Sequence, residues 1–301
     1  LLDGHELYIG ASIGISLFPD DGDSVEQILR NADSALFKAK SNGRSGYALY
    51  TEELTVHAQY RIEVASDLRR ALEQQELRVY YQPVHDLKTS RLIGVEALVR
   101  WEHPLRGLVP PGEFIPIAER TGLIAEIDAW VLEQACWQMC QWQSAGVHLS
   151  FVAVNISSRL FARPELYTLV STVLTDSGLD PALLELEVTE RTVMGDIDAI
   201  ISILSELKAI GVQLAIDDFG TGYSSLSYLR HFPIDRLKID RSFVTDITTD
   251  TSAAAIVDTI LSLARNLDLA VIAEGVETAE QLALLTQRGC DEAQGYLLGY
   301  P

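Results

Sequence analysis

The chain alternates short apolar runs with longer segments of helical periodicity. Residues 197–210 carry apolar side chains at the three- and four-residue spacing of an amphipathic helix, and Gly211 follows as a C-terminal cap. Strands that alternate with helices favour a mainly parallel sheet covered by helices. Eight apolar runs are candidate strands, the number found in a (β/α)8 barrel of the α/β class. They lie at residues 79–83, 92–97, 151–155, 185–189, 213–217, 236–239, 270–274 and 292–296.

The amino-terminal part follows a different pattern. Residues 11–16 predict a strand, and residues 25–40 predict an amphipathic helix. Residues 51–76 are rich in charge and in helix formers, which favours a linker helix. We therefore expect a short α/β fragment at 1–50, a linker helix at 51–76 and the barrel at 77–301. A piece of about 50 residues has little core to bury alone.

Acidic residues lie where several apolar runs end, such as the pair Asp217 and Asp218 after Ile216. Two unit charges about 4 Å apart repel by roughly 4 kcal/mol near a protein surface, so a buried pair must protonate, separate or bind a cation. The carboxyl ends of barrel strands meet at one mouth, where further polar residues are expected to converge and favour a metal site. These are Glu96, Asn155, Glu187, Lys238, Glu274 and Gln294.

The motifs around these residues resemble those of one family. They occur in the order Tyr81-Gln82-Pro83, Glu96-Ala97-Leu98, Asn155-Ile156-Ser157, Glu187-Val188-Thr189-Glu190, Asp217-Asp218-Phe219-Gly220-Thr221-Gly222, Lys238-Ile239-Asp240, Glu274-Gly275-Val276-Glu277 and Gln294-Gly295-Tyr296. This series resembles the EAL domain, a metal-dependent phosphodiesterase of cyclic di-GMP in bacterial signalling. Residues 32–40 with Gly43-Arg44 resemble the end of a GGDEF domain, a diguanylate cyclase module. The cyclase signature is absent from this chain, so no synthesis is assigned to it.

The resemblance implies two divalent ions, Mg²⁺ or Mn²⁺, which prefer carboxylate and amide oxygens. Asp217 would bridge an ion held also by Glu96, Asn155 and Glu187 to a second ion held with Asp218 and Glu274. Water activated between the ions would hydrolyse cyclic di-GMP to linear pGpG without a covalent intermediate. Ca²⁺ is expected to inhibit.

Further roles follow from the same resemblance. Lys238 matches a lysine that contacts the attacking water, and Glu274 is either a metal ligand or the general base, which sequence leaves open. Glu190 matches the residue that anchors the segment 218–228, whose end contributes to a homodimer contact. The positions that hold the dinucleotide are Gln82, Arg100 and Gln294, and the supporting residues are Glu277 and Thr221.

Composition narrows the class of partner. The 301 residues carry a formal charge of −20, which argues against a nucleic-acid polymer, because phosphate backbones are gripped by clustered Lys and Arg. No apolar run reaches the roughly 18 residues of a membrane span. We therefore expect a cytoplasmic protein, with any membrane anchor of the full-length protein outside this sequence.

Other interpretations stay open. An EAL domain can bind cyclic di-GMP as a receptor without cutting it, although receptors usually lack one or more of the acids that are all present here. A different barrel phosphatase or lyase would also place acids at strand ends. Taken singly, Asp217-Asp218 also fits a turn entry, and Asn155-Ile156-Ser157 fits a glycosylation acceptor.

Overall fold

The computed structural model describes residues 10–41, 46–194, 196–222 and 226–301, in two compact units, Leu1–Arg70 and Ala71–Pro301. The first unit contains a two-stranded parallel sheet with a helix against it. Gly14 makes that approach possible, because a Cβ there would lie 2.0 Å from Ala32 O. The predicted strand and helix are thus both present. The elements are β1 (Ile13–Ile15), α1 (Val25–Ser41) and β2 (Tyr47–Leu49), and α2 (Glu52–Glu73) follows where the linker helix was expected.

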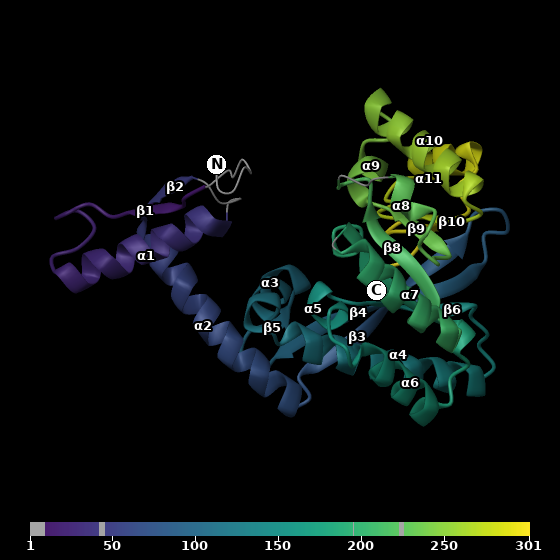
Figure 1. Ribbon diagram of the computed structural model, residues 1–301, viewed down its shortest axis with the longest axis horizontal. Coiled ribbons are helices and arrows are strands. Elements are labelled where there is room, and N and C mark those ends of the chain that lie inside the picture. Colours follow the sequence, from purple (N-terminus) through teal and green to yellow (C-terminus); the bar gives the residue numbers. More distant parts are fainter. Residues whose placement is uncertain (1–9, 42–45, 195, 223–225) are drawn as a thin grey trace. The chain divides into compact units, whose positions relative to one another are not determined.

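The second unit is an eight-stranded closed barrel with helices around it, and each predicted strand is present (Figure 1). A short strand, β5 (Gly107–Val109), pairs only with β4, outside the closed ring. Around the ring the strands are β3 (Leu77–Asp86), β11 (Glu292–Gln294), β10 (Ala270–Ala273), β9 (Arg236–Ile239), β8 (Gln213–Phe219), β7 (Leu184–Thr189), β6 (Phe151–Asn155) and β4 (Leu92–His103).

One strand departs from a wholly parallel barrel. β3 is antiparallel to both of its neighbours, β4 and β11. β4 continues to His103, although its pairing with β6 stops at Ala97, so Glu96 lies within a strand rather than at its end. It nevertheless sits level with Ala153 of β6, close to the carboxyl end of that strand. The hairpin of β3 and β4 therefore extends past the rim and forms a wall at one side of the mouth.

Helices cover the outside of the strands, and their ends agree with their sequence signals (Figure 1). The helix predicted at 197–210 has those bounds, and Gly211 caps it at φ 104°. Pro181 starts a 3₁₀ turn, Pro181–Leu183. The others are α3 (Pro111–Thr121), α4 (Ile124–Ser144), α5 (Ser158–Phe161), α6 (Leu166–Ser177), a 3₁₀ turn Thr192–Met194, α7 (Ile197–Ile210), α8 (Leu226–Leu229), α9 (Arg241–Thr245), α10 (Thr251–Asn266) and α11 (Ala279–Arg288).

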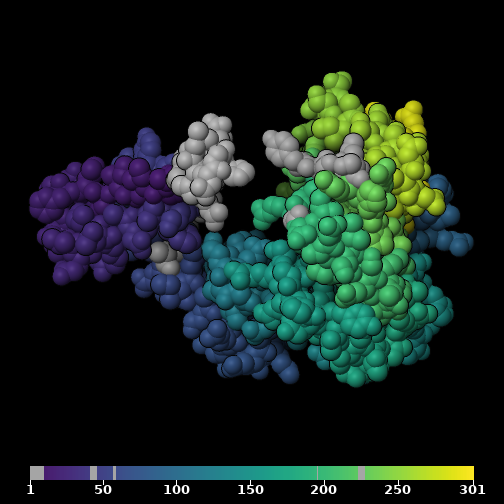
Figure 2. Space-filling model, in the orientation of Figure 1, coloured from purple at the N-terminus to yellow at the C-terminus, as the bar shows by residue number. Residues whose placement is uncertain are grey.

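Segments follow one another around the barrel in chain order, and Figure 2 shows the same succession of teal, green and yellow-green segments on the visible face of the second unit. Within the ranges that the structure describes, no helix has the length and apolar content needed to cross a lipid bilayer.

Candidate active site

Lys238 lies at the centre of the barrel mouth, and its side chain is only 1 % exposed. Its Nζ lies 2.7 Å from Glu187 Oε2 and 2.7 Å from Glu274 Oε1. Two longer ion pairs join the same Nζ to Glu96 Oε2 at 3.4 Å and to Asp217 Oδ1 at 3.6 Å. Four acids predicted from separate motifs therefore meet on one ammonium group.

Burial and mutual repulsion shift the pKa values of this cluster. Burial alone lowers the pKa of Lys238, but the surrounding carboxylates outweigh it and hold that pKa well above its usual value. Burial raises the pKa of Glu274 to about 8 and raises the pKa of Glu187 strongly. For Glu96, burial is outweighed by Lys238 and by hydrogen bonds, so its pKa falls. Burial and neighbouring negative charges thus disfavour the ionised forms of Glu187 and Glu274 in the absence of a further cation.

Amide side chains orient Glu96. Asn155 Nδ2 donates to Glu96 Oε1 at 2.6 Å, and Gln294 Nε2 donates to Glu96 Oε2 at 2.6 Å. Gln294 Nε2 also lies 3.1 Å from Gln82 Oε1, and Gln82 Nε2 donates to Gly299 O at 3.2 Å. The structure therefore brings Asn155 and Gln294 to the acid cluster, where strand ends were expected to place them, and Gln82 lies beside Gln294.

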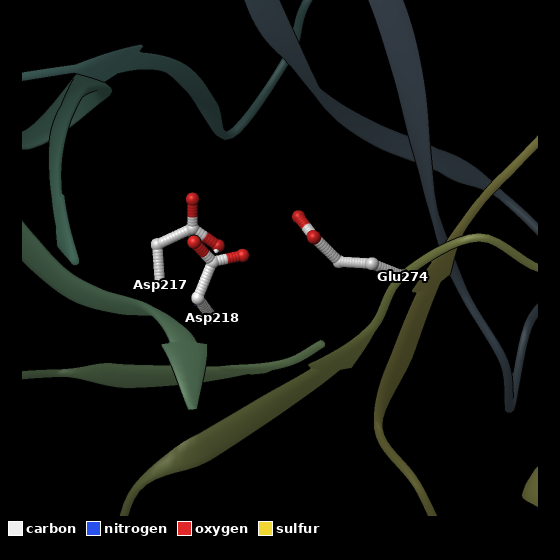
Figure 3. Close-up of side chains that lie close together, drawn as sticks. All are labelled: Asp217, Asp218 and Glu274. Carbon is white, nitrogen blue, oxygen red and sulfur yellow. Dashed lines mark hydrogen bonds between the residues drawn. The ribbon is translucent and has the colours of Figure 1, made fainter. Parts of the chain in front are cut away.

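A bulge in β8 includes the two adjacent aspartates. The register shifts between Ile216 and Phe219, and Asp218 has a φ of 54°. As a result, carboxylate oxygens of Asp217, Asp218 and Glu274 lie within 4.8 Å of one another, with Glu274 reaching in from across the mouth (Figure 3). Burial and the charge of Asp217 raise the pKa of Asp218 to about 6.

Glu190 fixes the backbone that follows these aspartates. Its Oε2 accepts hydrogen bonds from Gly220 N at 2.8 Å and from Gly222 N at 3.2 Å, and its side chain is buried. A Cβ on Gly222 would lie 2.7 Å from Glu190 Oε1, so a larger residue there would displace the Glu190 carboxylate. Thr221 Oγ1 donates to Asp218 O at 2.9 Å. Within the segment 218–228, residues 223–225 lie outside the described residues.

A cavity of about 330 Å³ opens over the acid cluster. Glu96, Asp217 and Glu274 line it, and so does the exposed Glu277. Two lining residues were given no role from sequence: the aromatic Tyr296, 53 % exposed, and Arg241, the first residue of α9. Each lies two residues after a strand end, Tyr296 after β11 and Arg241 after β9. Proximity to a strand end is also the signal that identified the acids.

A second cavity, about 300 Å³, lies on the other side of Asp217 and is mainly apolar. Arg100 lines this cavity rather than the first, and its Nη1 donates to Val99 O at 2.9 Å. Asp128 of α4 also lines it and accepts a hydrogen bond from Ser157 N at 2.9 Å. Burial raises the pKa of Asp128 to about 6. Sequence reasoning missed this residue, although an acid on the apolar side of a helix beside Ile127 was a usable signal.

The donor set fits hard divalent cations. It consists of carboxylates and one amide, and no cysteine lies among the side chains described at the mouth. The five carboxylates of the cluster exceed the one ammonium by four negative charges, which two divalent cations would offset. This balance agrees with the number of ions that the motifs implied. The five acids are Glu96, Glu187, Asp217, Asp218 and Glu274.

The fold and the carboxylate-rich mouth together define the class: an α/β barrel with an acidic site. Comparison with known protein families then identifies the family. The EAL domain model matches residues 65–301, and the model of the diguanylate cyclase GGDEF domain matches residues 2–46. The chain belongs to the EAL domain family, with a GGDEF fragment at its amino-terminal end.

Two curated relatives come from Pseudomonas aeruginosa. The bifunctional diguanylate cyclase/cyclic di-GMP phosphodiesterase MucR is 48 % identical over 297 residues, which are 99 % of this chain and 43 % of that protein. The cyclic di-GMP phosphodiesterase NbdA is 43 % identical over 300 residues, all of this chain and 38 % of that protein. The chain thus spans about two fifths of the length of these relatives.

Solved structures agree with the fold. The PaMucR phosphodiesterase in complex with c-di-GMP has a TM-score of 0.77 and 49 % identity, and the match covers 79 % of this chain and 97 % of that one. The FimX EAL domain from Pseudomonas aeruginosa bound to c-di-GMP has a TM-score of 0.71 and 28 % identity, over 77 % and 93 % of the two chains.

Proposed function

We propose that this chain hydrolyses cyclic di-GMP to linear pGpG with two divalent metal ions, Mg²⁺ or Mn²⁺. The observation that carries the proposal is the meeting of Glu96, Glu187, Asp217 and Glu274 around Lys238 at the mouth of the barrel. Relatives named as cyclic di-GMP phosphodiesterases, similar over nearly the whole chain, supply the substrate class.

The proposed ligands divide between two sites that share Asp217. Glu96, Asn155 and Glu187 complete the first, and Asp218 and Glu274 complete the second. When bound, such ions activate water and offset the charge that develops on the phosphate oxygens. In this proposal the Lys238 ammonium orients the attacking water and the phosphate. Glu274 accepts the proton of that water if it is not occupied by metal.

The two cavities suit the two halves of a cyclic dinucleotide. They share Leu98 and Asp217, so a ligand that occupies both places its middle over the acid cluster. In the first cavity, the exposed ring of Tyr296 offers a stacking surface to a base. In the second, Asp128 offers an acceptor for the donors on the edge of guanine, and Arg100 supplies positive charge.

The test is product analysis with the purified chain. We expect linear pGpG with Mg²⁺ or Mn²⁺, no product after chelation, and inhibition by Ca²⁺. Asp217→Asn is expected to lower turnover by more than about 100-fold, since even outer partners of metal ligands cost roughly 10- to 100-fold. Glu133→Gln, an exposed position on α4, is the matched control.

A receptor is the alternative. Retention of cyclic di-GMP without product, in every metal, would overturn hydrolysis and favour a binding module. An absence of both binding and product would leave a different barrel phosphatase or lyase as the better proposal.

A further inference from the structure

The Lys238 ammonium contacts carboxylate oxygens that are proposed metal ligands. Its Nζ lies 2.7 Å from oxygens of Glu187 and Glu274, one acid from each proposed metal site. It also lies 3.6 Å from Asp217, the proposed bridging ligand. A protein cation therefore sits between both sets of metal ligands.

The arrangement is built into the barrel. Lys238 and its four acidic partners project from five different strands or strand ends, and the lysine is enclosed by them at 1 % exposure. Without this ammonium the mouth would hold five carboxylates with no cation among the residues that make these ion pairs. At the distances seen here their repulsion would amount to several kcal/mol, as roughly 4 kcal/mol per pair at 4 Å shows. Protonation of some of these acids or a cation among them must offset that repulsion before metal arrives, and the Lys238 ammonium is the cation in these ion pairs.

We propose that Lys238 is a built-in counter-cation that keeps the acid cluster assembled in the metal-free protein and that metal ions must displace from Glu187 and Glu274. This inference rests on the proposed metal-dependent function and adds a second role for the lysine. Lys238 contributes to stability without metal and weakens metal affinity, because it repels incoming cations and occupies their oxygens. Once displaced, its ammonium is free for the water and phosphate.

The test compares Lys238→Met, which removes the charge at similar length, with Lys238→Arg, which keeps it. Mn²⁺ binding is followed by the electron paramagnetic resonance signal of free Mn²⁺, and thermal unfolding is followed in chelator and in Mn²⁺. We expect K238M to bind the first Mn²⁺ about tenfold or more tightly than the wild type, since one unit charge at such range is worth more than a factor of ten. We expect its melting temperature to fall in chelator and to recover in Mn²⁺, and K238R to keep the wild-type affinity within about threefold.

K238M that binds Mn²⁺ no more tightly than the wild type, or that is equally destabilised with and without metal, would overturn the inference. A purely structural lysine predicts that second result. If K238M does not fold in either condition, the wild type decides the question. Its lysine ammonium ¹H–¹⁵N signal, assigned by its loss in K238R, is expected to shift on addition of Mg²⁺, and an unchanged signal at saturating Mg²⁺ contradicts displacement.

Failure of this inference is separable from failure of the proposed function. A wild type that binds Mn²⁺ and releases pGpG, together with a K238M variant of unchanged affinity, rejects only the counter-cation. A wild type that neither binds Mn²⁺ nor cuts cyclic di-GMP rejects the function itself.

Discussion

Glu190 is the residue that ties the backbone after Asp218 to the barrel, through two charge-assisted hydrogen bonds from Gly220 and Gly222. Such bonds are each worth about 1.5–3 kcal/mol. We expect Glu190→Ala to loosen Asp218 and to lower both turnover and affinity for the second metal ion by about tenfold or more. Steady-state kinetics against Mn²⁺ concentration measures both, with Glu133→Ala as the surface control. Unchanged turnover and unchanged Mn²⁺ dependence would mean that Glu190 does not act on the metal site.

Asp128 makes the protein less stable as pH rises. Burial raises its pKa in the folded state to about 6, above the ordinary value of 3.8, so the folded state holds this proton more tightly than the unfolded state does. The resulting stability is complete below about pH 4 and is lost as pH rises through about 6; a shift of about two units amounts to roughly 3 kcal/mol.

Asp128→Asn removes that titration. We expect its melting temperature, relative to the wild type, to increase progressively from about pH 4 to about pH 7 and to stay level above that. Thermal unfolding across this range, followed by circular dichroism, measures the difference. A difference that does not vary with pH would show that Asp128 titrates alike in the folded and unfolded states.

At the scale of elements, a second polar group lies one step deeper in the barrel than the acid cluster. Arg236 precedes Lys238 by two residues on β9, and it pairs with Glu185 of β7 and with Glu292 of β11, whose Oε1 lies 3.1 Å from Nη2. All three side chains are buried. The guanidinium also lies over the ring of Phe151, 4.4 Å from its centroid. This group joins three strands of the barrel.

We expect Arg236→Ala to lower the free energy of unfolding by about 3–5 kcal/mol, because it leaves two buried carboxylates without their cation. Arg78→Ala is the matched control. Its ion pair with Glu102 is about half exposed, so its loss is expected to cost about 0–1 kcal/mol. Urea denaturation measures both. Equal losses in the two variants would show that the buried group contributes no more than a surface pair.

Hydrophobic periodicity predicted the existence and order of the strands, because helices with clear signals such as Gly211 separate most of them. It did not predict the direction of β3. That information was present in the five residues 87–91, which are too few for a crossover between parallel strands and long enough for a hairpin.

Motif order similarly predicted that the acids of the cluster meet at the mouth, since each ends or follows an apolar run of the sequence. It could not predict Asp128, which reaches its cavity from a helix, or the pairing of Arg236, which depends on the register between β7, β9 and β11. The pairing of Arg236 arises only through packing of distant elements and leaves no local signal in the chain, whereas Asp128 could have been found as an acid on the apolar side of its helix.

At the scale of the whole molecule, the chain consists of two compact units, and all the described site residues belong to Ala71–Pro301. We expect a truncated chain of residues 50–301, which retains α2, to fold and to hydrolyse cyclic di-GMP within about twofold of the longer chain, because compact units of this size carry their own core. Kinetics and circular dichroism of the two chains compare them. Aggregation of the shorter chain, or a tenfold loss of turnover, would contradict this independence.

Dimer formation remains a prediction, carried by the segment 218–228. Sedimentation of the purified chain over a range of concentrations tests it, and a monomer at all concentrations would contradict it.

The antiparallel strand β3 closes the barrel through two pairings that differ greatly in sequence separation. On one side β3 meets β4 through a short turn, which can form early because its partners are neighbours in the chain. On the other side it meets β11, and the contact of Gln82 with Gln294 joins positions 212 residues apart. The barrel is closed only when β3 pairs with β11. Both glutamines lie beside Glu96. During refolding, recovery of turnover would therefore report the closure of the barrel, the last stage of folding. Recovery of the helical circular dichroism signal alone would report the early formation of helices.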